Sequence, residues 1–198
     1  MGFLKALRAP VLVLALLWVT LYLPFAATVY TPQWYSFHCS WSSECRFAEH
    51  FEPSEAAGEL AAFLAHRGEP DAAWPPDERE QLEAVRSNLD RLFAATLGAL
   101  FLLVVTFGWN RLATAARVNV VAIPVLALVT GLSFRTFWVE GLLPLLGVPM
   151  VVYEDSVAAF LMSEALYGYS LFFGALIGFL INLVLVWQVR PQRRSIFR

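Results

Sequence analysis

Charged residues are scarce in this sequence. Only 15 % of its 198 residues are Asp, Glu, Lys or Arg, whereas 59 % are hydrophobic and the mean hydropathy is +0.60. Soluble domains usually carry more charge and fewer apolar residues, so this composition favours an integral membrane protein. The chain also lacks a phosphate-binding glycine loop, an internal repeat and a concentrated basic patch. We therefore expect no nucleic-acid partner.

Acidic residues are missing from both ends of the chain. All 16 of them lie between Glu44 and Glu164. Three segments hold basic residues and no acid, and their basic members are Lys5, Arg8, Arg111, Arg117, Arg190, Arg193, Arg194 and Arg198. Basic segments that alternate with acidic ones across apolar stretches follow the positive-inside pattern. The pattern predicts a multi-pass protein with both termini in the cytoplasm and the acidic segments outside.

Four apolar stretches approach the length of about 20 residues that a membrane-crossing helix needs. They cover residues 10–29, 91–110, 118–135 and 165–188. We expect one membrane domain, residues 1–198, of the all-α class, with a small helical extracytoplasmic cap at 30–90 and an apolar outer loop at 136–164. That loop is interrupted by glycine and proline, so it is either re-entrant or interfacial. A cleaved signal peptide is the alternative to the first span.

Residues 76–110 predict one continuous helix that leaves the cap and enters the second span. Asp77 and Glu80 have the spacing of a capping box. Leu82, Val85 and Leu89 then recur at helical spacing, and residues 92–109 carry no charge. After this helix, residues 111–117 are expected to form a short basic inner loop, and Pro124 is expected to kink the third span.

A second helix is predicted inside the cap. Ser54 suits its N-cap, Leu60, Phe63 and Leu64 form its apolar stripe, and Gly68 suits the residue that ends it. Because the cap is too small for a core of its own, we expect it to pack on the membrane helices.

The two cysteines, Cys39 and Cys45, both fall in the predicted exterior segment. An oxidising compartment allows them to form a disulfide, and two free thiols are the alternative. Their C-x5-C spacing is neither a redox motif nor a strong metal signal. We predict no metal and no cofactor.

The fourth span contains Gly174 and Gly178, a G-x-x-x-G pair that lets another helix approach closely. This face could receive another membrane subunit. Asn182 in the same span is expected to form an interhelical hydrogen bond rather than to bind a ligand.

Four short patterns resemble the bacterial membrane family that contains the lipoprotein intramolecular transacylases. They are residues 31–35 (T-P-x-aromatic-Tyr), the helix around Phe63-Leu64, residues 80–86 (H-L-x-D-V-R/K), and Asp155-Ser156 followed by Ser163-Glu164. The resemblance implies a protein of the bacterial cytoplasmic membrane. It also implies an enzyme that moves an acyl chain from the diacylglyceryl group of a lipoprotein to the α-amine of the same cysteine. Gln81, Ala84 and Trp138 stand where that family is expected to carry His, Asp and His.

Acyl transfer needs a base for the amine, polarisation of the ester carbonyl and a water-poor site. The candidate catalytic residues are Glu164, Asp155 and His38, with Glu154 and Asp155 alternatively capping the fourth helix. The candidate lipid- or substrate-facing residues are Gln81, Arg86, Arg135, Trp138, Tyr153 and Glu154. Arg86 or Arg135 is expected to pair with Glu164, whereas His50 and His66 are expected to be solvated. The expected partners are membrane lipids and lipoproteins.

Three functions follow from this sequence. The first is a divergent transacylase that uses carboxylates, with His38 as a further base, in place of the family's histidines. The second is a catalytically silent relative that binds lipids or lipoproteins in the outer leaflet. The third is a structural subunit of a larger membrane complex.

The predicted orientation can be tested at Cys39. In intact cells treated with a reductant, a membrane-impermeant thiol reagent is expected to label Cys39, because residues 30–90 are predicted to lie outside. The control is the same labelling after cell lysis. Labelling only after lysis would show that residues 30–90 lie inside, which is the inverse of the predicted topology.

Overall fold

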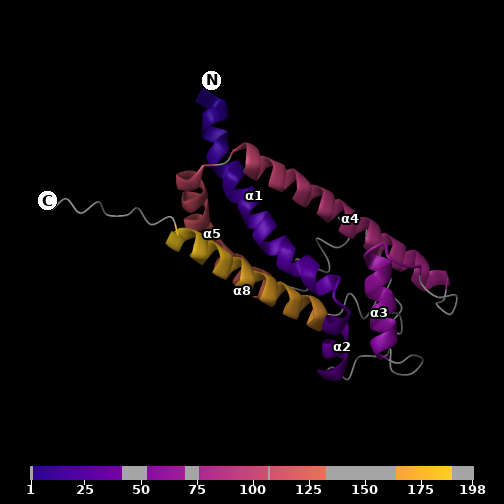
Figure 1. Ribbon diagram of the computed structural model, residues 1–198. Coiled ribbons are helices and arrows are strands. Elements are labelled where there is room, and N and C mark those ends of the chain that lie inside the picture. Colours follow the sequence, from indigo (N-terminus) through magenta and orange to yellow (C-terminus); the bar gives the residue numbers. More distant parts are fainter. Residues whose placement is uncertain (1, 42–52, 70–75, 107, 133–163, 189–198) are drawn as a thin grey trace.

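The computed structural model describes residues 2–41, 53–69, 76–106, 108–132 and 164–188. These residues are almost entirely helical and contain no strand, which confirms the all-α class. The helices are α1 (Gly2–Val29), α2 (Pro32–Trp41), α3 (Pro53–Leu64), α4 (Pro76–Val105), α5 (Trp109–Leu132) and α8 (Glu164–Gln188), as Figure 1 shows. The predicted apolar loop, apart from Glu164 at its end, lies outside the described residues.

Three helices contain stretches that are long and apolar enough to cross a membrane. These stretches are Leu7–Val29 in α1, Leu82–Val105 in α4 and Trp109–Gly131 in α5. Helix α8 lies where the fourth span was predicted, but its apolar stretch in the described residues, Phe172–Gln188, is shorter. The chain is therefore a helical protein with three candidate spans and one shorter apolar helix.

Helix α1 lies at the centre of the bundle and contacts α4, α5 and α8. Small residues allow these close contacts: Ala115 and Ala116 of α5 pack against Leu12 and Leu16 of α1. Small residues at helix contacts are typical of membrane proteins, where backbones must approach without help from the hydrophobic effect.

The glycines of α8 face α1. A Cβ atom added to Gly178 would lie 2.8 Å from the Thr20 carbonyl oxygen, and one added to Gly174 would lie 3.5 Å from the Leu21 carbonyl oxygen. The predicted close approach therefore occurs, and the helix that approaches belongs to the same chain. A second subunit would have to bind another surface.

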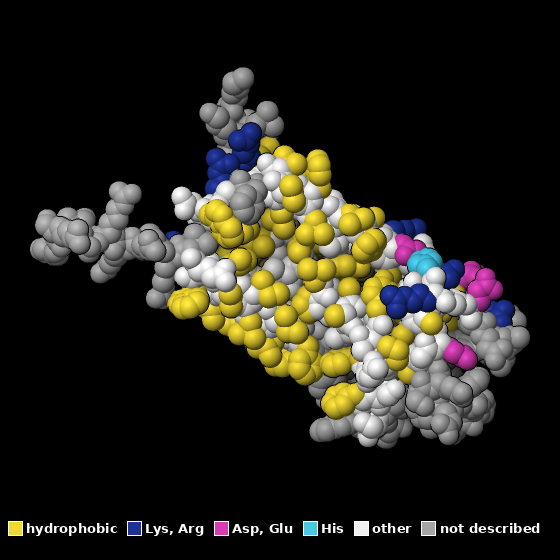
Figure 2. Space-filling view, in the orientation of Figure 1, with side chains coloured by type: hydrophobic (Ala, Val, Ile, Leu, Met, Phe, Trp, Pro, Cys, Tyr) yellow, Lys and Arg dark blue, Asp and Glu magenta, His cyan; other side chains and the backbone are white. Residues whose placement is uncertain are grey.

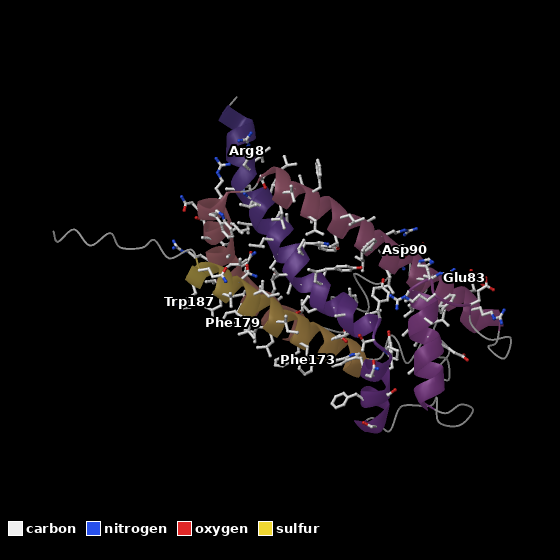
Figure 3. All side chains as sticks on the ribbon, viewed as in Figure 1. Arg8, Glu83, Asp90, Phe173, Phe179 and Trp187 are labelled. Carbon is white, nitrogen blue, oxygen red and sulfur yellow. The ribbon has the colours of Figure 1, made fainter. Side chains whose placement is uncertain are left out.

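Large apolar side chains point away from the helix contacts. On α4 the exposed ones recur at helical spacing and include Phe93, Leu97, Leu100, Phe101 and Val104. Along α8, Phe172, Leu176, Leu180, Val184 and Trp187 are similarly exposed, and Figure 3 shows the labelled Trp187 at the outside of the bundle. In Figure 2 hydrophobic side chains cover the middle of the molecule, whereas charged side chains gather at its ends. This arrangement suits a lipid environment.

Polar side chains inside the bundle bond across helices. Asn182 Nδ2 donates to Thr20 Oγ1 at 3.2 Å and to the Gly178 carbonyl at 2.8 Å, which confirms the predicted interhelical bond. Trp18 Nε1 donates to Thr96 Oγ1 at 2.9 Å and joins α1 to α4. In an apolar medium such bonds satisfy groups that would otherwise be costly to bury.

We call α2, α3 and the first half of α4 the cap. Its buried residues form one cluster with the neighbouring end of α1; the fully buried members are Tyr35, Ala57, Leu60, Ala61, Phe63, Leu64, Leu82, Val85 and Leu89. Phe25 and Val29 of α1 pack against that cluster. The predicted apolar stripes of both helices and their packing on a membrane helix are thus observed. The sequence did not predict α2.

The boundary between α4 and α5 differs from the prediction. Helix α4 ends at Val105 and α5 begins at Trp109, so residues 111–117 are the first turns of α5 rather than a loop. The Gly108 carbonyl accepts the first backbone bonds of α5, from Arg111 and Leu112. Alanine-rich sequence favours helix here, and the connection shortens to the few residues around Gly108.

The two predicted N-cap residues, Ser54 and Asp77, were wrong for the same reason. Helices α3 and α4 begin at Pro53 and Pro76, so Ser54 and Asp77 lie inside the first turn rather than at the N-cap. Proline suits the first helical position because its φ angle is already helical and its missing N–H has no partner there.

The predicted end of α3 at Gly68 was also wrong. His66 takes the left-handed conformation, with φ 56°. The N–H of His66 donates to the Phe63 carbonyl and that of Arg67 to the Ala62 carbonyl, which is the Schellman pattern. His66 therefore ends the helix at a position usually occupied by glycine.

The α1–α8 contact can be tested by adding one methyl group. Gly178→Ala is expected to destabilise the protein by about 1–3 kcal/mol, because its Cβ must displace the Thr20 backbone. Gly98→Ala is the matched control, since nothing lies within 4 Å of the added atom. Thermal unfolding in detergent measures both. Equal stability of the two variants would show that α1 and α8 do not pack this closely.

Candidate interfacial polar site

Most residues that the sequence singled out cannot be placed. Arg135, Trp138, Tyr153, Glu154, Asp155 and Cys45 lie outside the described residues. His38 and Cys39 lie on α2, Gln81 on α4, and Glu164 begins α8, but only their backbone is described. The predicted disulfide and the predicted catalytic roles therefore stay predictions.

Arg86 is the predicted site residue whose side chain is described. Its guanidinium carbon lies 4.3 Å from the centre of the Phe63 ring, so α4 and α3 are joined by a cation–π contact. The sequence had proposed Glu164 as its partner.

A histidine–aspartate pair joins the end of α3 to α4. His66 Nε2 lies 2.9 Å from Asp90 Oδ1 and 3.1 Å from Asp90 Oδ2. Both side chains are about half exposed, at 55 % and 51 %. Sequence reasoning missed the pair because its members are 24 residues apart. The left-handed turn at His66 is the feature that ends α3 beside α4.

The pair lies where α4 changes from polar to apolar. Asp90 and Arg91 are the last charged residues of α4, and residues 92–109 carry no charge. Figure 3 shows Asp90 where α4 passes α3, and Figure 2 shows the histidine beside acidic and basic side chains at this end. In a membrane this boundary corresponds to the level of the lipid headgroups.

Two tyrosines of the α1 segment lie near Asp90. Burial raises the pKa of the Tyr30 hydroxyl, the adjacent Tyr22 hydroxyl lowers it, and the negative charge of Asp90 raises it. The net pKa is raised, so Tyr30 remains protonated at neutral pH and can donate a hydrogen bond. Tyr22 is 6 % exposed and stacks on Trp18. Its hydroxyl interacts with the Tyr30 hydroxyl, and no other polar partner of it lies among the described residues.

Asn88 supplies a second buried donor. It is 7 % exposed, its Oδ1 accepts a bond of 3.4 Å from Arg91 Nη1, and its Nδ2 has no partner among the described residues. Asn88 precedes Thr96 by about two turns, and Thr96 bonds to α1 through Trp18. Asn88 therefore lies on the side of α4 that faces α1.

The unpaired amide of Asn88 indicates a place for an acceptor. Leaving a buried donor without a partner costs about 1–3 kcal/mol. Asn88 lies two residues before Asp90 on α4 and is therefore close to the His66–Asp90 pair. A ligand with a carbonyl oxygen would satisfy this amide.

The described residues contain no group of three His, Cys, Asp or Glu side chains that could hold a metal ion.

Comparison with known proteins adds no assignment. No family model matches the chain, and no curated protein or solved structure matches it either. The resemblance to the transacylase family stays a prediction.

The contact between the Tyr22 and Tyr30 hydroxyls can be tested by stability measurements. In lipid-free detergent, Tyr22→Phe is expected to change the free energy of unfolding by less than about 0.5 kcal/mol, because its hydroxyl forms no close hydrogen bond. Tyr35→Phe is the matched control: Tyr35 is 1 % exposed and its hydroxyl donates to the Val29 carbonyl. That variant is expected to lose about 1 kcal/mol. An equal loss for Tyr22→Phe would show that its contact with Tyr30 is a full hydrogen bond.

Proposed function

We propose that this protein transfers an acyl chain within lipoproteins at the membrane surface, with the His66–Asp90 pair as the acid–base group. The observation that carries the proposal is this pair, placed where α4 turns from polar to apolar. Further support comes from the resemblance of four sequence patterns to the lipoprotein transacylase family. In this proposal the cap lies outside the cytoplasmic membrane, as the charge distribution predicts.

The pair replaces the histidine that Gln81 fails to supply. Asp90 holds Nε2 of His66, so Nδ1 is the nitrogen left to act as a base. A carboxylate that fixes the ring and stabilises its protonated form is the usual companion of a catalytic histidine. His66 thereby takes the role for which the sequence had suggested His38.

The reaction then needs no added reagent. The amine nitrogen of the acceptor attacks the ester carbonyl carbon, and its proton passes to His66. The C–O bond of the ester breaks, and the leaving alkoxide takes the proton back from His66. The products are an amide and an alcohol, which together form the lyso-lipoprotein. General acid–base help of this kind contributes about 10²–10⁴-fold in rate.

The buried donors of Tyr22 and Asn88 suit the ester carbonyl. Donors aimed at an oxygen on which charge develops stabilise the transition state, most strongly where water is excluded. Asn88 lies two residues before Asp90 on α4, and Tyr22 lies in the apolar stretch of α1, along which acyl chains would enter from the bilayer. The polar headgroup and the apolar acyl chains of the substrate would thus lie on opposite sides of the boundary at Asp90.

The function can be tested by expression in a host that lacks the activity. Wild-type protein is expected to convert diacylated lipoproteins to the lyso-form, detected by mass spectrometry. His66→Gln is expected to lower conversion about 100-fold or more, because an amide cannot accept the proton. Wild-type protein that is folded but inactive would refute the proposal.

The matched control is His38→Gln, which is expected to retain activity. If His38→Gln loses activity and His66→Gln keeps it, the base is His38 and not His66. His66→Gln preserves a donor to Asp90, and an exposed ion pair contributes only about 0–1 kcal/mol, so its thermal unfolding should match wild type. Glu164→Ala and Asp155→Ala in the same assay test the carboxylates that the sequence suggested.

A further inference from the structure

Three arginines lie at the end of the bundle opposite the cap. Arg8 belongs to α1, whereas Arg111 and Arg117 belong to the first turns of α5, and all three side chains are exposed. Figure 3 labels Arg8 near the start of α1, and Figure 2 shows basic side chains gathered there. We call these three residues the arginine end.

The packing of α1 on α5 places the three at the same end of the bundle. Leu12 packs against Ala115 and Ala116, and Figure 1 shows both helices starting at the same end. Arg8 and Arg111 each lie one turn before these contacts. Arg117 follows Arg111 by six residues, a rise of about 9 Å along α5 and a turn that leaves it about 120° away around the helix. The three charges therefore share one level of the bundle and lie on different sides of it.

The described residues supply no counter-charge to these arginines. No acidic residue precedes Glu44, and none lies between Arg91 and Leu132. No carboxylate among the described residues pairs with Arg8, Arg111 or Arg117. Within the described part of the chain the arginine end is thus a site of positive charge that is open to an anion from outside.

Exposed apolar side chains surround the arginines. Leu7 is 41 % exposed, Trp109 57 % and Val118 47 %, and each is next or nearly next in sequence to an arginine. A free phosphate gains nothing from such apolar neighbours, whereas the acyl chains of a lipid pack against them. A tryptophan beside basic residues also suits the level of lipid headgroups.

We propose that Arg8, Arg111 and Arg117 bind headgroup phosphates of anionic phospholipids, whose acyl chains lie along the exposed apolar side chains of α1 and α5. Guanidinium groups offer paired donors that match phosphate oxygens. This binding is independent of the proposed acyl transfer, because it uses the opposite end of the molecule.

The test is a lipid titration of the full-length protein in neutral detergent. Native mass spectrometry is expected to show preferential binding of phosphatidylglycerol over phosphatidylcholine. Each Arg→Gln substitution is expected to weaken phosphatidylglycerol binding about fivefold, and the triple variant should lose the preference. Because the three side chains are exposed, the variants should fold, and the single variants suffice if the triple variant does not.

Two controls make the test decisive. Arg67→Gln removes an exposed arginine at the cap and should leave the preference unchanged. Inorganic phosphate at the same concentration should not displace the lipid. The proposal is overturned if the arginine variants keep the wild-type preference, if Arg67→Gln lowers binding as much as Arg111→Gln, or if inorganic phosphate competes as well as the lipid.

Discussion

The close contact of α8 with α1 is the constraint on which this bundle depends. A side chain at Gly178 would collide with the Thr20 carbonyl, and Asn182, one turn later, bonds to the Thr20 hydroxyl. In an apolar medium helices gain little from hiding apolar surface, so van der Waals contact and hydrogen bonds must hold them together. Small residues supply the first, and Thr20, Asn182, Trp18 and Thr96 supply the second. Helix α1 can therefore contact three other helices at once.

Helix α4 carries this packing into the cap. Its apolar half exposes large side chains on one side and faces α1 with Thr96 and Ala99 on the other. Its polar half packs through Leu82, Val85 and Leu89 on α3. Because one rigid helix spans both regions, Asp90 is held at the boundary between them. This position is the one that the proposed acyl transfer requires, since the ester of a lipid-linked substrate lies between a polar headgroup and apolar chains.

Local sequence rules predicted the helices better than their ends. The spacing of Leu60, Phe63 and Leu64 identified the buried face of α3, because helical periodicity depends only on near neighbours. The exact end of a helix depends on which of several neighbouring residues takes the capping position. Proline at the first helical position displaced Ser54 and Asp77 from the N-cap, and His66 adopted the left-handed conformation that Gly68 was expected to provide. Both outcomes involve small energy differences that the residue types alone do not settle.

Composition, hydropathy and periodicity by themselves determined that this protein is helical, rich in membrane-compatible stretches and divided into apolar helices and a small cap. They also determined that Asn182 would bond across helices, since a buried amide must find a partner. Only the tertiary structure decided that α1 covers the glycine face of α8, that His66 meets Asp90, and that the buried amide of Asn88 keeps an unpaired donor. The physical reason is the separation in sequence over which each kind of interaction acts. Periodicity states which face of a helix is buried, but the partner of that face depends on how distant segments pack.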